Sequence, residues 1–300
     1  MTTELLPIGT TMGAVTLRVA NLDALTSFYR DAVALTVLSA AKESVTLGRG
    51  RTPLIILEAA PELKHASPRD AGLFHTAILF DSEAALAASV YSVATKAPGS
   101  FTGSADHLVS KAFYFTDPEG NGVELYWDRD RTQWSWAHGR VEMSVLFLDT
   151  TAFLREHLTE EATVAANFGA AVVGHVHLCV GDVESSREFY VHKLGFETTS
   201  ELGNSALFVS AGKYHHHMAM NTWNSTGAGR RARTLGLGQV DIVVPNFDEL
   251  GAIGERMAHY RVDSTNEAHE GGHTLSFTDP WNNLMRITTG APARAMSLGS

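Results

Sequence analysis

Hydrophobic and polar positions along the chain follow one order that occurs four times. Residues 75–80, HTAILF, have the apolar character of a buried strand, and the run EAALAASVYSVATKA at 83–97 has the spacing of an amphipathic helix. Between them Asp81 and Ser82 are suitable helix caps. Three further strand-like runs complete the pattern, which predicts β-α-β-β-β units. The predicted units span 10–60, 70–128, 171–224 and 234–290.

The units are similar to one another at a nearly constant distance along the chain. GAVTLRVANLDALTSFYRDAVAL at 13–35 matches GHVHLCVGDVESSREFYVHKLGF at 174–196. FTDPEGNGVELYW at 115–127 matches FTDPWNNLMRITT at 277–289. Self-similarity at a fixed period indicates a duplicated structural unit. The sequence therefore predicts an α+β fold with helices 22–35 and 183–195 in equivalent places.

The duplication divides the chain into two domains and a linker. We expect an N-terminal domain at 8–128, a connector at 129–170 and a C-terminal domain at 171–290. A length of 300 residues with 44% hydrophobic side chains is sufficient for two buried cores. Within the connector, TTAFLREHLTEEA at 150–162 predicts one short helix.

The copies are not chemically equal. Three positions carry a possible metal ligand in one copy only: His175 opposite Ala14, Glu124 opposite Arg286, and His75 opposite Gln239. Taken singly, each ligand has another interpretation, such as a buried core histidine or a carboxylate paired with an arginine. Two histidines and one carboxylate on rigid strands are together typical of non-haem Fe(II) sites. The set therefore favours a metal centre.

Composition narrows the function classes. A net charge of −10 and a pI near 5.7 argue against a nucleic-acid or anionic-membrane partner, because both reward a basic surface. No run approaches the roughly 20 apolar residues of a membrane span. The N-terminus lacks a secretory pattern, and the single cysteine, Cys179, fits a reducing compartment. We expect a soluble, cytoplasmic protein.

Several motifs support a family resemblance that covers about residues 10–288. They are F-Y-R-D-x-V-x-L, F-Y-x-x-K-L-G-F, D-P-x-G-N-x-x-E-L-Y, the run GLFHTAIL, the stretch D-H-x-V-S-x-A-x-Y ending at Tyr114, and the run KYHHHMAMNTW. On these motifs the chain resembles the vicinal oxygen chelate superfamily, and more narrowly the bacterial catechol 2,3-dioxygenases of the extradiol type. The resemblance implies paired units that form cup-shaped sheets around a divalent metal.

The chain departs from the best-known extradiol enzymes in the source of its ligands. In those enzymes the third and fourth units supply the triad, whereas here the fourth unit has Gln239 and Arg286. The second unit offers His75 and Glu124 instead. We therefore expect the second and third units to pair around one metal, and the first and fourth to pair without one. If the first unit instead paired with the second, and the third with the fourth, neither cup-shaped sheet would contain all three ligands.

The resemblance also implies an activity. It predicts a dioxygenase that opens a small aromatic diol with O2, at Fe(II) or alternatively Mn(II) bound by His75, Glu124 and His175. His216 is the candidate acid-base group, and His107 and Tyr114 are candidates for binding the substrate oxygens.

The histidine run leaves one assignment open. Strand alternation would place His215 and His217 on one face and His216 on the other, and a register slip of one residue would exchange the faces. Phe74, Phe113 and Trp223 are either walls of an aromatic pocket or ordinary core.

Two other function classes remain open. One is a metal-dependent glyoxalase-like isomerase or thiol transferase, and the other is a non-catalytic drug-binding protein, since one scaffold hosts many functions. The identity of the catechol and the oligomeric state, including a homo-oligomer, are also left open.

Overall fold

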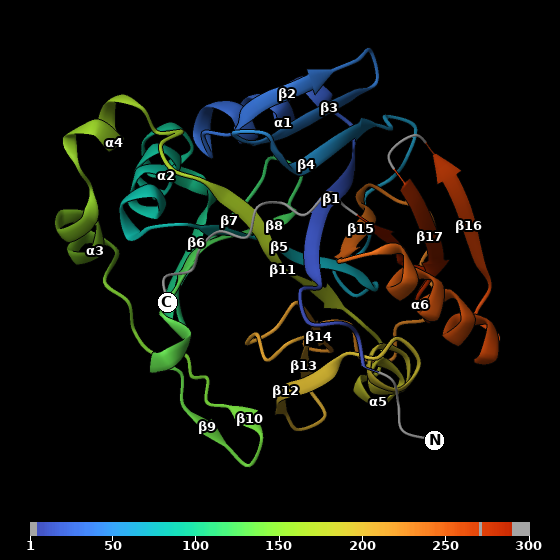
Figure 1. Cartoon of the computed structure of the whole chain (residues 1–300). Coiled ribbons are helices and arrows are strands. Elements are labelled where there is room, and N and C mark those ends of the chain that lie inside the picture. Colours follow the sequence, from blue (N-terminus) through green and yellow to red (C-terminus); the bar gives the residue numbers. More distant parts are fainter. Residues whose placement is uncertain (1–4, 270–271, 290–300) are drawn as a thin grey trace.

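The computed structural model of the chain describes residues 5–269 and 272–289 and contains two eight-stranded mixed sheets (Figure 1). We call one the histidine sheet, because it carries His75 and His175; its strand order is β12-β13-β14-β11-β5-β8-β7-β6. Its strands are β5 (Gly72–Phe80), β6 (Phe101–Asp106), β7 (Ser110–Thr116), β8 (Gly122–Asp128), β11 (Ala171–Cys179), β12 (Glu197–Leu202), β13 (Ala206–Ser210) and β14 (Met218–Asn221).

The second sheet, called the sister sheet below, has the equivalent order β16-β17-β18-β15-β1-β4-β3-β2. Its strands are β1 (Thr11–Val19), β2 (Thr36–Ala40), β3 (Ser44–Arg49), β4 (Thr52–Ala59), β15 (Gly236–Val244), β16 (Ser264–His269), β17 (Gly272–Thr278) and β18 (Leu284–Thr289).

Each sheet is assembled from both halves of the chain. In the histidine sheet β5 of the second unit pairs antiparallel with β11 of the third. In the sister sheet β1 of the first unit pairs antiparallel with β15 of the fourth. The predicted α+β class and the predicted pairing of units are both confirmed.

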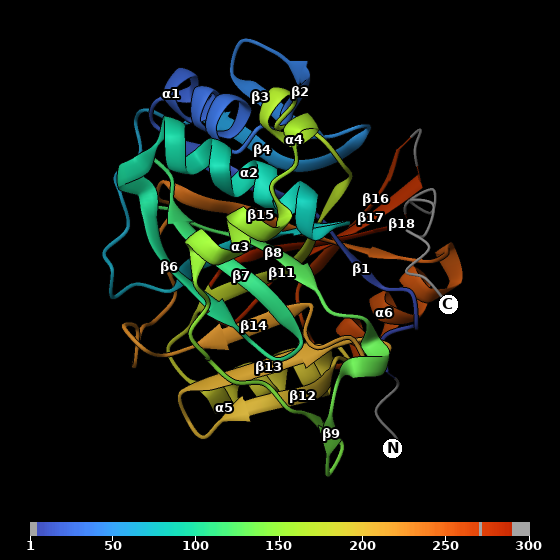
Figure 2. The same ribbon diagram turned by 90° about the vertical axis from the view of Figure 1, so that its left-hand side faces the viewer.

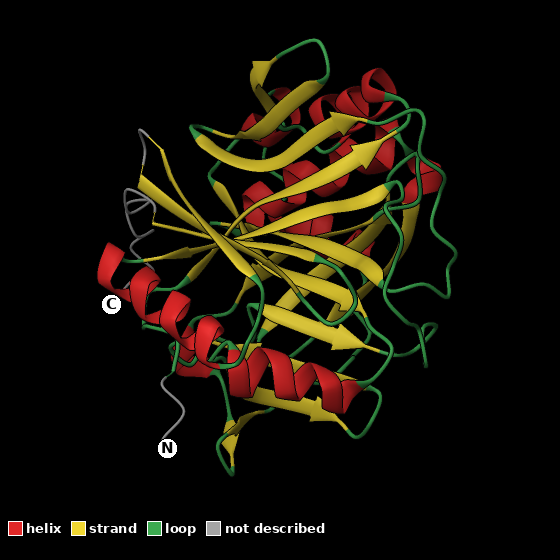
Figure 3. Cartoon of the chain, turned by 90° about the vertical axis from the view of Figure 1, so that its right-hand side faces the viewer, coloured by secondary structure: helices red, strands yellow, loops and turns green. Residues whose placement is uncertain are grey.

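Helices lie at the periphery, while the strands run through the middle of the molecule (Figure 3). The helices of the four units are α1 (Leu22–Ser27), α2 (Glu83–Lys96), α5 (Val183–Ser186) and α6 (Phe247–His259). Among the described residues, no helix is long and apolar enough to cross a membrane.

Two predicted helices are only partly α-helical. The helix expected at 22–35 changes after α1 to a wider π-helical turn, Phe28–Ala32, and the helix expected at 183–195 does the same at Arg187–Lys193. Phe28 and Tyr29 are adjacent, yet both are buried. A regular helix turns about 100° per residue, so a wider turn helps both rings reach the core.

A buried hydrogen bond explains why the same motifs occur in each half. The Tyr29 hydroxyl donates to Asp117 over 3.1 Å, and the Tyr190 hydroxyl donates to Asp279 over 2.9 Å. Each aspartate also accepts from backbone N–H groups of its own turn. The Phe-Tyr and Asp-Pro motifs therefore join the first unit to the second and the third to the fourth, and their role is structural.

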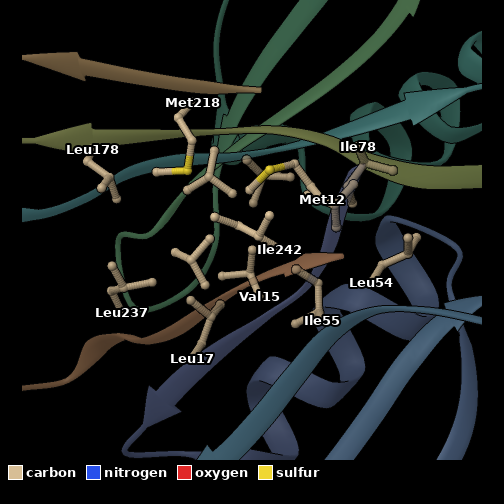
Figure 4. Packing of buried hydrophobic residues seen from close by; sticks show 14 of the residues in the cluster. Met12, Val15, Leu17, Leu54, Ile55, Ile78, Leu178, Met218, Leu237 and Ile242 are labelled. Atoms are coloured by element: carbon tan, nitrogen blue, oxygen red, sulfur yellow. The ribbon is translucent and has the colours of Figure 1, made fainter. Parts of the chain in front are cut away.

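The two sheets pack face to face through their central strands. Leu17 of β1 and Ile242 of β15 lie in the same apolar layer as Ile78 of β5 and Leu178 of β11 (Figure 4). Because side chains alternate along a strand, the neighbours of these core residues point to the opposite face. That opposite face of the histidine sheet carries the candidate site.

The connector forms more structure than expected. It contains a hairpin of β9 (Trp136–Ala137) and β10 (Arg140–Val141), followed by α3 (Thr150–His157) and α4 (Glu160–Val164), and α3 and α4 pack against α2 (Figure 2). The prediction of one continuous helix at 150–162 is therefore wrong, because two helices form there. The chain is extended at Leu158, and the Thr159 hydroxyl accepts from the Ala162 N–H to cap a second helix.

Candidate metal centre

Three adjacent strands bring the predicted triad together. His75 lies on β5, Glu124 on β8 and His175 on β11. The strand register places Ala77 between His175 on one side and Glu124 on the other. The small Ala77 side chain allows the two larger groups to approach each other to hydrogen-bond distance.

The ligand atoms have the spacing of a shared metal site. His75 Nε2 lies 2.9 Å from Glu124 Oε2, and His175 Nε2 lies 3.1 Å from the same oxygen. One ligand atom from each residue lies within 4.8 Å of the others. Ligands bound about 2.1 Å from a metal at adjacent octahedral positions are about 3 Å apart, which matches these distances.

One of these contacts has an ion-pair distance but not the geometry of a hydrogen bond. Buried His75 Nε2 has no hydrogen-bond partner within the part of the chain that the structure describes, even though the carboxylate is close. A buried nitrogen without a partner is costly unless something else satisfies it. The donor set therefore fits a divalent cation.

Burial and neighbouring side chains shift the pKa values of two triad residues, His175 and Glu124. Burial lowers the pKa of His175 to about 4, so its imidazole is neutral near pH 7. Burial alone would raise the pKa of Glu124, but the imidazoles of His175 and His75 outweigh it and hold that pKa well below its ordinary value. A neutral imidazole at His175 and an ionised carboxylate at Glu124 are the forms in which these groups bind a metal.

A cavity of about 910 Å³ opens in front of the triad. His75, Glu124 and His175 line it, and so do the other three predicted site residues, His107, Tyr114 and His216. The structure thus places all six side chains around one space.

His107 and Tyr114 form a hydrogen-bonded pair on one wall of the cavity. His107 Nδ1 is 2.7 Å from the Ser144 carbonyl oxygen, so this nitrogen is the donor. The other nitrogen, Nε2, is 2.7 Å from the Tyr114 hydroxyl and accepts its proton in the neutral ring. Burial, followed by the nearby Glu124 carboxylate, raises the pKa of Tyr114 well above its ordinary value, so the phenol stays protonated.

The histidine run does not lie on a strand as predicted. Strand β14 begins only at Met218, because Gly212 and Lys213 have positive φ angles of 64° and 57° and form a turn before it. The expectation of strand alternation for the histidines is therefore wrong. His216 lines the cavity, whereas His217 points elsewhere and its Nδ1 accepts from the Ala211 N–H.

Behind His216 lies a chain of hydrogen bonds that sequence reasoning missed. Asp128 Oδ1 is 2.9 Å from His215 Nε2, and His215 Nδ1 is 2.7 Å from His216 Nδ1. A carboxylate only accepts, so His215 carries its proton on Nε2, and in the neutral rings His216 must donate through Nδ1. The Nε2 atom of His216 is then an unprotonated base. Alternation along β8 from Glu124 to Asp128 was an available signal for this aspartate.

Aromatic side chains continue the cavity wall from the triad toward solvent. The ring centroids of His75 and His177 are 4.9 Å apart, those of His177 and Trp223 5.4 Å apart, and those of Phe74 and Trp223 5.3 Å apart. Phe74 and Trp223 are thus pocket walls. Phe113 is fully buried in the core, outside the cavity lining, so the wall interpretation is wrong for it.

The sister sheet has an ion pair at the equivalent place. In the strand register, Gln239 lies opposite Thr16, as His75 lies opposite His177 in the histidine sheet. Asp241 lies opposite Arg286, as Ala77 lies opposite Glu124. Arg286 contacts Asp241 through Nε at 3.0 Å and Nη2 at 2.7 Å, and Gln239 donates to the same carboxylate. Among residues 5–269 and 272–289, the histidine sheet carries the one group of three potential metal ligands.

Comparison with known proteins agrees with this geometry. The model of the Glyoxalase/Bleomycin resistance protein/Dioxygenase superfamily matches residues 11–125 and 172–287. The chain belongs to this superfamily. Its two matched segments are tandem glyoxalase-type domains, each with two β-α-β-β-β units.

Individual superfamily members are similar over most of the chain. A catechol-2,3-dioxygenase from Bacillus subtilis (strain 168) is 34% identical over 267 residues, which cover 85% of this chain and 91% of that protein. The structure of a presumed dioxygenase from Bacillus subtilis subsp. subtilis str. 168 has a TM-score of 0.65 at 14% identity, covering 98% of this chain and 88% of the other. Glyoxalase I from Zea mays has a TM-score of 0.57 at 16% identity, with 93% and 92% coverage. The two structures support the shared fold alone.

Proposed function

We propose that this protein is an extradiol dioxygenase that opens the ring of a catechol with O2. The observation that carries the proposal is the buried triad of His75, Glu124 and His175, which faces a cavity containing three further proton-handling side chains. Homology to a catechol-2,3-dioxygenase supports the reaction type. Two histidines and one carboxylate leave coordination positions for substrate and O2 on non-haem Fe(II), and Mn(II) has compatible ligand preferences.

The triad residues would hold the metal, and the other side chains would act on the substrate. Bound Fe(II) would supply Lewis acidity and one-electron redox chemistry. Tyr114, fixed by His107, offers its phenol oxygen to a substrate hydroxyl and orients the ring. His216 accepts a proton at Nε2 and returns one later in the reaction. Asp128 and His215 hold the His216 ring in the tautomer for the first of these steps.

A glyoxalase-like isomerase or a thiol transferase would also use a metal on this fold. Neither explains why His107, Tyr114 and His216 surround the triad as well. A non-catalytic drug-binding protein would need none of these six residues. The six together favour ring cleavage over the alternatives.

The test is reconstitution without oxygen. The protein is loaded with Fe(II), mixed anaerobically with catechol and then exposed to O2, while absorbance reports the yellow ring-opened semialdehyde. We expect product with Fe(II) and none with Zn(II), which binds similar ligands but has no redox chemistry. Mn(II) in a parallel sample decides which of the two metals is active. Stoichiometric Fe(II) binding without product from any of several catechols would contradict the proposal.

A further inference from the structure

The size of the cavity carries information about the substrate. A cavity of roughly 150 Å³ accommodates one benzene ring, so the observed 910 Å³ is about six times what a bare ring needs. It is also near the upper end of the roughly 300–1,000 Å³ typical of pockets for drug-sized ligands. A metal ion and a catechol ring therefore leave most of the space for something else.

The charge of the lining is equally informative. Among residues 5–269 and 272–289, Glu124 of the triad is the one carboxylate that lines the cavity, and no lysine or arginine of these residues lines it. The described lining therefore offers no lysine or arginine to pair with a carboxylate or sulfonate on the ring. Burying an unpaired charge is costly, so an anionic substituent would be disfavoured.

The cavity opens to solvent through apolar side chains. Val145, Leu202 and Trp223 line it and are 79%, 55% and 48% exposed, whereas the triad at its inner end is buried. His177 and Trp223 connect the two ends by successive ring contacts. Half-exposed apolar side chains at the mouth of a pocket are a surface that an apolar ligand group would cover.

We infer that the natural substrate is an uncharged catechol with a bulky apolar substituent, an aryl or alkyl group that lies against Trp223 and Leu202. This inference rests on the proposed function, because it assumes that the diol binds at the triad. The ring occupies the inner end beside Tyr114 and His216, and the substituent extends along the aromatic wall toward the mouth.

The test compares substrates that differ only in the substituent. We expect kcat/KM to rise at least tenfold from catechol to propyl- or phenyl-substituted catechols, because each buried methylene contributes roughly fourfold. We expect 3,4-dihydroxyphenylacetate, a substituted but anionic catechol, to gain nothing over catechol. Equal kcat/KM values across the neutral series, or a preference for the anion, would overturn the inference.

Two variants locate the substituent. Trp223→Ala should reduce the ratio of kcat/KM between phenylcatechol and catechol by tenfold or more, while Trp136→Ala, which removes an exposed tryptophan outside the cavity lining, should leave that ratio unchanged. Leu202→Arg places a cation at the exposed mouth and should raise kcat/KM for the anionic catechol relative to phenylcatechol. An unchanged ratio in Trp223→Ala would contradict the assigned wall.

An anaerobic binding series separates the two proposals. Calorimetry on the metal-loaded protein without O2 should give the same order of affinity, with phenylcatechol tightest. If the catechols are cleaved without this order, the inference fails and the proposed function stands. If none is cleaved, the proposed function fails, and the calorimetric order alone decides whether the cavity selects apolar, uncharged ligands.

Discussion

The histidine sheet and the sister sheet have equivalent strand orders and the same register between their central strands, but they carry different charged and polar side chains at equivalent positions. In the histidine sheet, the row of His175, Ala77 and Glu124 brings a ligand nitrogen within 3.1 Å of a ligand oxygen. In the sister sheet, the corresponding row holds Asp241 beside Arg286, and the guanidinium of Arg286 lies on the Asp241 carboxylate. The first arrangement could hold a metal ion, whereas the second pairs its carboxylate with a cation of the chain itself.

This difference shows that strand pairing alone does not make the site. Different residues at a few strand positions give three potential metal ligands in one sheet and an ion pair in the other, while the strand order is equivalent. We expect changes in the triad of the histidine sheet to affect metal content and activity, and changes in the ion pair of the sister sheet to affect stability alone. Four variants test this contrast between the sheets.

The largest effect is expected for Glu124→Ala. Loss of the carboxylate removes the one negatively charged ligand of the triad, so metal affinity should fall by more than about 100-fold, because loss of even an outer supporting group costs roughly 10–100-fold. Metal content after dialysis and oxygen consumption with catechol are the measurements. Fully loaded Glu124→Ala protein would refute the ligand role of this residue.

The next effect is expected for His216→Ala. Positioned acid-base groups contribute roughly 10²–10⁴-fold, so turnover should fall by at least about 10²-fold. Metal content should remain at the wild-type value, since His216 is outside the triad. Turnover near that of the wild type, at full metal loading, would show that a different group handles the proton.

A smaller effect is expected for Asp128→Asn, which replaces the acceptor that fixes the His215 tautomer. We predict a fall in kcat of roughly 10–100-fold, the range for an outer group that orients a site, with a changed pH profile of kcat. Asp130→Asn is a matched control, because Asp130 is exposed and caps a short helical turn instead. Equal kcat values for the two variants would mean that the hydrogen-bonded chain has only a structural role.

The smallest effect is expected for Arg286→Ala in the sister sheet. It leaves the mostly buried Asp241 without its cation, but Arg286 is partly exposed, so we predict a loss of about 1 kcal/mol in the free energy of unfolding. Denaturant unfolding measures the loss. The double variant Arg286→Met, Asp241→Ala should recover part of it. Metal content and turnover should not change, and a loss of bound metal would contradict the contrast between the sheets.

Features that depend on local pattern or on the repeat were predictable from the sequence. Many strands and helices follow from hydrophobic periodicity, although the helices expected at 22–35 and 183–195 continue as π-helical turns and residues 150–162 form parts of two helices. The pairing of units followed from where the potential ligands remained. The triad could be predicted because the positions equivalent to His75, Glu124 and His175 in the other copy hold Gln239, Arg286 and Ala14. Comparison of the two copies therefore distinguished these candidate ligands from ordinary buried residues.

Features that depend on contacts distant in sequence were not predictable. The turn at Gly212 and Lys213 removes His215–217 from the strand, because left-handed backbone there is not specified by hydrophobic spacing. Asp128 meets His215 across 87 residues, and Ser144 reaches His107 from the connector. Only the folded sheet brings these partners together.

The number of metal ions bound per chain is the decisive measurement for a single metal centre in the histidine sheet. The protein is incubated anaerobically with excess Fe(II), desalted, and its bound metal is measured per chain by elemental mass spectrometry, beside Glu124→Ala and Arg286→Ala. We expect one metal per chain in the wild type and in Arg286→Ala, and almost none in Glu124→Ala. Two metals per chain, or none in the wild type, would contradict the assignment of a single metal centre to the histidine sheet.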